Sequence, residues 1–123
     1  MLMKIGYCPQ EGLLIEELTV EQNIRLSGLL KGLKERYVSR YMMKMIIYFR
    51  LRAVLQVRAV YLSASQKKKV SLIMAFLGFP RLLLFDEVTG SVDPEGRKRI
   101  LNLIKSYSND LEGTVIISSH DIA

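Results

Sequence analysis

Two short apolar runs constrain the fold of this chain more than any other feature of its sequence. The runs are Leu82 to Phe85 and Thr114 to Ile117, and polar residues follow each of them at once. Such runs are typical of strands buried on both faces of a parallel sheet. The segment between them predicts a helix, because Asp93 can cap it and Pro94 suits the first helical position. This order of elements predicts an α/β layer with a parallel sheet.

The residues before these runs predict a mainly helical lobe inserted ahead of the α/β core. Residues 1–10 are typical of a strand end followed by a loop. Thr19 and Gln22 have the spacing of a capping box, and residues 35–60 predict further helix. Residues 64–77 form a helical pattern that ends before Gly78 and Pro80. Two apolar helical faces are expected, one of Val20, Ile24, Leu29 and Leu30, the other of Ile100, Leu101, Ile104 and Tyr107.

Composition excludes several classes of protein. The 123 residues are 50% hydrophobic and 24% charged, which is a globular composition. A single cysteine, Cys8, rules out a disulfide within the chain and favours a reducing compartment. No apolar run reaches the roughly 18 residues that span a bilayer, and we expect no secretory leader.

The positive charge is concentrated in the middle of the chain. The net charge is +6, and the stretch from Lys31 to Arg58 holds eight basic residues and one acid, Glu35. Such a stretch permits binding to anionic lipid headgroups or to nucleic acid. A solvated helical face is the alternative interpretation.

Candidate chemistry lies at the ends of the predicted strands. Asp86 and Glu87 follow the first apolar run, where ligands bind in open α/β sheets. One carboxylate can hold Mg²⁺ through water while the other faces a reacting water. Surface acids in a turn are the alternative. His120 ends the second run and Gln10 follows the first predicted strand; each can contact a phosphate or a water, or have only a structural role.

A second candidate lies where residues 62–66, Leu-Ser-Ala-Ser-Gln, open a helix. Backbone N–H groups at a helix start bind phosphate, and the Ser63 hydroxyl adds a donor. Lys67, Lys68 and Lys69 follow, which the helix dipole disfavours unless an anion comes near. An ordinary serine-capped helix is the alternative interpretation.

Together, these segments resemble the ATP-binding cassette (ABC) ATPases over nearly the whole chain. Residues 5–10 resemble the Q-loop region, 62–66 the signature motif, and 82–87 Walker B with its catalytic glutamate. Residues 91–93 resemble the D-loop, and His120 the switch histidine. The Tyr-Cys-Pro-Gln sequence at 7–10 and the short gap to the signature look most like subfamily A, the lipid-exporter type.

The resemblance implies a fold and a division of the chain. The fold would be an incomplete parallel-sheet core of the P-loop NTPase type with an inserted, mainly helical ABC subdomain. Residues 1–10 would end the Q-loop strand and residues 11–80 would form the helical and signature subdomain. Residues 81–123 would carry the Walker B, D-loop and switch-histidine part of the core.

The resemblance also implies a role for each site residue, with ATP and Mg²⁺ as cofactors. Gln10 would sense the metal and the attacking water, Asp86 would hold Mg²⁺ through water, and Glu87 would polarise that water. His120 would contact the γ-phosphate. Residues Ser63, Ala64, Ser65 and Gln66 would bind ATP held by a second cassette, and Asp93 would link the two cassettes. Transmembrane domains would be the other partner, on the cytoplasmic face of a membrane.

Two departures from the family pattern bear on activity. The phosphate loop Gly-x-x-x-x-Gly-Lys-Ser/Thr is absent from this sequence, which predicts a fragment of a longer cassette with little ATPase activity by itself. Ala64 and Ser65 replace the two signature glycines and add a Cβ where backbone approaches phosphate. A non-hydrolysing module that lends its signature face to another cassette is the alternative. We expect no nucleic-acid partner, since no recognised nucleic-acid motif is present.

Overall fold

The computed structural model describes residues 5–8, 14–78, 82–86, 93–110 and 114–118. Its elements alternate between strands and helices, with a group of helices between the first two strands. In chain order they are β1 (Ile5–Cys8), α1 (Val20–Leu30), α2 (Glu35–Tyr48), two 3₁₀ turns (Arg52–Val54 and Ala59–Tyr61), α3 (Ala64–Phe76), β2 (Leu82–Asp86), α4 (Pro94–Asp110) and β3 (Thr114–Ser118).

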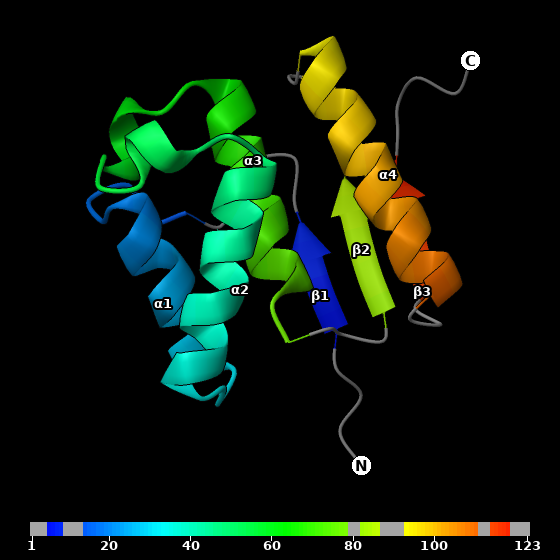
Figure 1. The fold of residues 1–123 in the computed structure, drawn as a ribbon, viewed down its shortest axis with the longest axis horizontal. Helices are drawn as coiled ribbons and strands as arrows, with labels where there is room; N and C mark the ends of the chain where they lie inside the picture. The colour runs from blue at the N-terminus through cyan, green and yellow to red at the C-terminus, as the bar shows by residue number, and fades with distance from the viewer. Residues whose placement is uncertain (1–4, 9–13, 79–81, 87–92, 111–113, 119–123) are drawn as a thin grey trace.

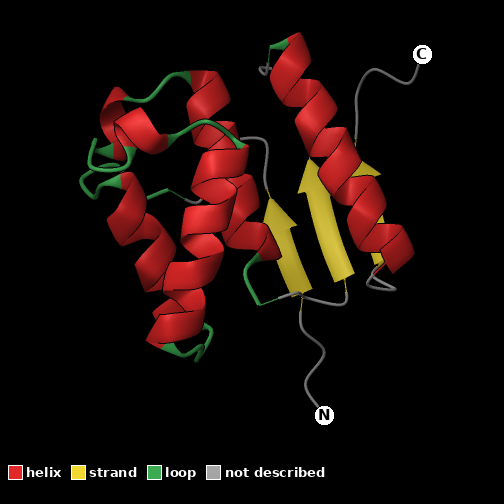
Figure 2. Ribbon diagram, in the orientation of Figure 1, coloured by secondary structure: helices red, strands yellow, loops and turns green. Residues whose placement is uncertain are grey.

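The strands form one parallel sheet in the order β1-β2-β3 (Figure 1). Cys8 is the register partner of Phe85, and Asp86 is the partner of Ser118, so the strands end at a common edge. α3 packs against β1 and α4 against β3. Figure 2 shows α1 and α2 on the far side of α3 from the sheet. The predicted α/β fold with an inserted helical layer is therefore confirmed.

The backbone N–H groups at the start of α1 all donate hydrogen bonds to acceptors in the chain. The predicted capping box is present: Thr19 Oγ1 accepts a hydrogen bond from the backbone N–H of Gln22, and Gln22 Oε1 accepts one from the backbone N–H of Thr19. The next two amides are also used: Val20 N–H donates to Val57 O and Glu21 N–H to Leu55 O. The first turn of α1 therefore has its amide donors occupied.

α2 is shorter than the sequence predicts. The predicted helix over 35–60 ends at Tyr48, because Arg50 takes a left-handed conformation with φ of 58° and the Leu51 amide bonds back to Ile46 O. The segment between the two 3₁₀ turns that follow presents the carbonyls of Leu55 and Val57 to α1. In a continuous helix those carbonyls would accept from amides of the same helix. Their hydrogen bonds to α1 therefore compete with helix formation in this segment.

Two expected apolar faces are partly wrong. Val20 and Ile24 are fully buried, but Leu29 and Leu30 are 73% and 78% exposed. α1 meets α2 at Gly28, whose missing side chain lets Val38 approach closely. On α4, Ile100 and Ile104 are buried as predicted, whereas Leu101 is half exposed.

Among the residues whose burial is described, the core lies between the helical layer and α3. It is made mainly of apolar side chains from α1, α2 and α3, with Ile100 and Ile104 from α4. The Tyr41 hydroxyl donates to Ile73 O at 3.2 Å, and burial raises the pKa of Tyr41 well above its usual value. Lys31 Nζ donates to Met74 O and Leu77 O at the end of α3, and Met74 O also accepts from the Leu77 backbone N–H.

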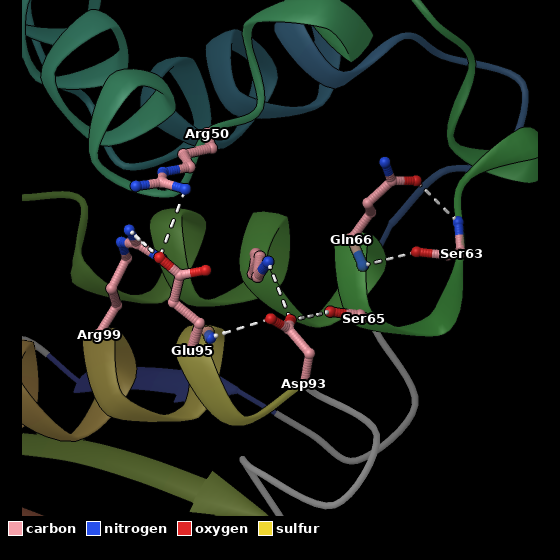
Figure 3. Close-up of polar contacts among 9 residues, drawn as sticks. Arg50, Ser63, Ser65, Gln66, Asp93, Glu95 and Arg99 are labelled. Carbon is pink, nitrogen blue, oxygen red and sulfur yellow. Dashed lines mark hydrogen bonds and ion pairs between the residues drawn. The ribbon is translucent and has the colours of Figure 1, made fainter.

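α2 also contacts α4 directly. The Tyr48 hydroxyl donates to Arg99 O at 2.8 Å. Arg50 Nη1 lies 3.3 Å from Glu95 Oε1, and Arg99 Nη2 lies 2.9 Å from the same oxygen (Figure 3). These contacts join the helical layer to the helix that covers the sheet.

Candidate functional site

The start of α3 carries the residues of the predicted signature motif. Ser63 Oγ accepts a hydrogen bond from the backbone N–H of Gln66 at 3.1 Å (Figure 3). In return, Gln66 Oε1 accepts one from the backbone N–H of Ser63 at 2.9 Å. Ser63 is therefore the N-cap of α3, and the two side chains form a reciprocal capping box. This box fixes the direction of the first helical turn.

The start of α3 differs from the start of α1 in one respect. α1 has acceptors from other parts of the chain for the amides of its first two residues, Val20 and Glu21. The equivalent amides of α3 belong to Ala64 and Ser65, and no residue that the structure describes accepts from them. Ala64 is exposed and Ser65 is half-buried. The same capping motif therefore leaves two amide donors of α3 without an acceptor among the described residues, at a helix start, which attracts anions.

The three lysines of this first turn have different surroundings. Lys67 Nζ lies 3.9 Å from Glu16 Oε1, and Lys69 Nζ lies 3.5 Å from Asp93 Oδ1. Lys68 is buried, with 4% of its surface exposed. Two of the three lysines thus have a carboxylate within reach, which offsets their unfavourable position in the helix dipole.

Asp93 brings the start of α4 next to the start of α3. As predicted, it caps α4: Gly96 N–H donates to Asp93 Oδ2 at 3.3 Å. Its other oxygen lies 3.4 Å from Ser65 Oγ (Figure 3). The same oxygen lies 3.5 Å from Lys69 Nζ. The hydrogen bond from Gly96 and the charge of Lys69 hold the pKa of Asp93 below its usual value. The resemblance implied a link between cassettes for Asp93, and the contacts described for it lie within the chain.

The contact between Ser65 and Asp93 was not foreseen from the sequence, although a signal for it exists. Ser65 and Lys69 are four residues apart, so they lie on one face of α3 and can reach the same carboxylate. Ser65 replaces a signature glycine, and a glycine would have no hydroxyl to offer.

The remaining predicted site residues are placed less fully. Asp86 is the last residue of β2, at the sheet edge where ligands bind in α/β folds. Gln10, Glu87 and His120 lie outside the described residues. Within the described ranges, no three His, Cys, Asp or Glu side chains come together as metal ligands. The predicted Mg²⁺ site therefore depends on Asp86 together with residues whose geometry is not described.

Comparison with known families decides the classification of the chain. The family described as "ABC transporter" matches residues 1–90. The chain belongs to the ABC transporter family.

Its relatives lie in subfamily A, as the sequence predicted. The chain is 35% identical over 106 residues to human ATP-binding cassette sub-family A member 10, which covers 86% of the chain. It is 37% identical over 101 residues to the rat protein named cholesterol transporter ABCA5, which covers 82% of the chain. It spans only 7% and 6% of the lengths of these relatives.

Solved structures show the same fold. An ATP-binding subunit of an ABC transporter matches 97% of the chain with a TM-score of 0.87 and 29% identity. A dimeric bacterial ABC transporter cassette matches 98% of the chain with a TM-score of 0.86 and 25% identity. The chain spans about half of each of these structures, 49% and 53%. No helix in the described ranges is long and apolar enough to cross a membrane.

Proposed function

We propose that the chain is part of the ATP-binding and hydrolysing cassette of a membrane transporter. In this proposal the start of α3 supplies a signature face to the phosphates of an ATP held by a second cassette. The observation that carries it is the pair of amides at Ala64 and Ser65, which no described residue accepts from, beside the Ser63 hydroxyl. These donors suit a phosphate group, and both substituted side chains are small.

The other site residues complete the proposed reaction centre. Asp86 and Gln10 would hold Mg²⁺ through water, Glu87 would polarise the attacking water, and His120 would contact the γ-phosphate. Bound Mg²⁺ would offset negative charge on the phosphates. Gln66 would act on the phosphate indirectly, because its side chain accepts a hydrogen bond from the Ser63 backbone N–H and holds that backbone in place. Residues 1–10, 11–80 and 81–123 would divide the chain between core and helical subdomain as the sequence predicts.

Phosphate binding at α3 can be tested on the chain itself. In ¹H–¹⁵N spectra of the full chain titrated with tripolyphosphate, we expect the largest shifts at the amides of Ala64 and Ser65. The amides of Val20 and Glu21 are the internal control, because their donors are already occupied. Equal shifts at the two helix starts, or none at α3, would contradict the proposal.

Two matched variants separate phosphate binding from helix capping. Ser63→Ala and Thr19→Ala each remove the serine or threonine of a capping box, at a cost of about 1 kcal/mol in stability. We expect only Ser63→Ala to weaken tripolyphosphate binding. If Thr19→Ala weakens it equally, the effect comes from stability rather than from the site.

Hydrolysis is expected to need residues beyond this sequence. No Gly-x-x-x-x-Gly-Lys-Ser/Thr motif occurs in it, so it contains no phosphate loop to hold the β- and γ-phosphates. We therefore infer that the chain by itself hydrolyses no ATP above background, as a phosphate-release assay can check. Activity that disappears in Glu87→Gln would contradict this inference.

A second candidate is a non-hydrolysing module that lends its signature face to another cassette. The accessible amides of α3 favour it, since they require nothing from a phosphate loop in the same chain. In either case we propose transmembrane domains and a second cassette as partners, at the cytoplasmic face of a membrane. One relative is named a cholesterol transporter, and from that likeness we infer a lipid as the cargo.

A further inference from the structure

The outward face of α2 carries side chains that the proposed function does not use. Five exposed residues on it lie within about one third of the helix circumference, as their spacing requires. They form what we define as the α2 stripe: Arg36, Arg40, Met43, Lys44 and Ile47. The opposite face is buried in the core, through Val38, Tyr41, Met42, Met45 and Ile46.

The α2 stripe consists of two parallel rows. Arg36, Arg40 and Lys44 follow one another four residues apart and form a cationic row about 12 Å long. Met43 and Ile47, also four residues apart, form an apolar row beside it and are 40% and 57% exposed. Rows with this spacing are the ridges that helices use when they pack against one another.

The cations of the stripe have no acidic partner among the residues that the structure describes. No Asp or Glu occurs between Glu35 and Asp86. Other arginines in the described ranges do form ion pairs: Arg25 pairs with Glu21, and Arg50 pairs with Glu95. None of the three cations of the stripe lies within ion-pair distance of a carboxylate in the part of the chain that the structure describes.

We propose that the α2 stripe binds an acidic amphipathic helix of a partner protein. The partner helix would place carboxylates four residues apart against the cationic row and apolar side chains against Met43 and Ile47. Charge complementarity selects the sign of the partner, and the row spacing selects a helix. This inference is independent of phosphate binding at α3.

A helix fits the stripe better than a bilayer surface does. A helix lying in a bilayer interface buries a wide apolar face and places cations around it. α2 already buries its wide apolar face in the core, and its cationic row flanks the exposed apolar row on one side only. Anionic vesicles are therefore the competing partner in the test.

The test uses the full chain and two synthetic helical peptides of about 18 residues, long enough to hold helix. The first peptide carries one row of glutamates and one row of leucines at four-residue spacing. The second has the same composition with the glutamates spread around the helix. We expect the first peptide to bind at least tenfold more tightly, and its addition to shift the amide signals of α2.

A matched pair of variants tests the location. Charge reversal of the stripe, R36E/R40E/K44E, should weaken binding of the first peptide by about tenfold or more. Reversal of three exposed cations on α4, R97E/K98E/K105E, changes the net charge equally and should leave binding within about twofold. Replacing Met43 and Ile47 with serine should weaken binding severalfold without altering charge.

Three outcomes would overturn the proposal. The first is equal loss of binding in both charge-reversal variants, which would mean general charge attraction. The second is equal binding of the two peptides. The third is binding to vesicles that contain about 30% phosphatidylserine, lost in R36E/R40E/K44E, while neither peptide binds. That result would assign the stripe to a membrane surface instead.

Discussion

The hydroxyl of Tyr48 lies 2.8 Å from the carbonyl oxygen of Arg99 and donates a hydrogen bond to it, across the boundary between α2 and α4. Tyr48→Phe keeps the ring, which also meets Phe49 edge to face, and removes only the donor. We expect the free energy of unfolding to fall by about 0.5–1.5 kcal/mol in urea titration. Tyr61→Phe is the control, because Tyr61 is 75% exposed and should change nothing. Equal effects of the two variants would refute the role assigned to this bond.

The close approach of α1 and α2 depends on Gly28. A Cβ at this position would lie 2.5 Å from Val38 Cγ2, which is a steric clash. Glycine to alanine normally stabilises a helix interior, but here we expect Gly28→Ala to cost about 1–3 kcal/mol of unfolding free energy. A double-mutant cycle checks the cause: adding Val38→Ala should recover part of the loss. Strictly additive costs would place the clash elsewhere.

The buried Ser71 hydroxyl has no hydrogen-bond partner among the described residues. A buried polar group without a partner is unfavourable, so Ser71→Ala should raise the free energy of unfolding, by up to about 1 kcal/mol. Tyr41→Phe is the opposite case, because the Tyr41 hydroxyl donates to Ile73 O, and its loss should destabilise the chain. Thermal unfolding of both variants distinguishes them. A destabilised Ser71→Ala variant would point to a partner for this hydroxyl.

The capping carboxylate of Asp93 should make stability depend on acid pH. Its pKa is lowered in the folded chain by the hydrogen bond from Gly96 and the charge of Lys69. The stabilisation it gives is therefore present above the ordinary aspartate pKa and is lost as the pH falls through the lower, folded value. Asp93→Asn keeps a capping oxygen without a titratable charge. The difference in Tm between the two proteins should shrink from pH 7 to pH 3, and a constant difference would exclude the charge as its source.

Much of the fold follows from patterns that act over a few residues. The two apolar runs, the capping residues Thr19 and Asp93, and the helix end near Gly78 all lie where the sequence predicts them, and Ser63 caps α3 as the alternative interpretation held. Each is indicated by residues that lie within one helical turn or one short run of the sequence. Such local signals need no knowledge of distant contacts.

The errors arise where distant segments decide the structure. The segment 49–60 leaves the helix, and its Leu55 and Val57 carbonyls accept from the first turn of α1, which is more than thirty residues earlier. Leu29 and Leu30 are exposed because α1 meets α2 through Gly28 rather than through its leucines. At the candidate site, the sequence indicated the donors of α3 but not the approach of Asp93, which depends on how α4 lies beside α3.

Both α3 and α4 begin at the sheet edge where the strands end (Figure 1). Their positive dipole ends are thus gathered at that edge, together with the predicted signature residues and Asp93. At the far end of α3, the ammonium group of Lys31 covers the carbonyls of Met74 and Leu77. A cation thus lies at the negative pole of α3, while the Ala64 and Ser65 amides at its positive pole have no acceptor among the described residues. An anion that approaches the start of α3 therefore meets the positive pole of the helix, whereas a cation of the chain already lies at the opposite pole.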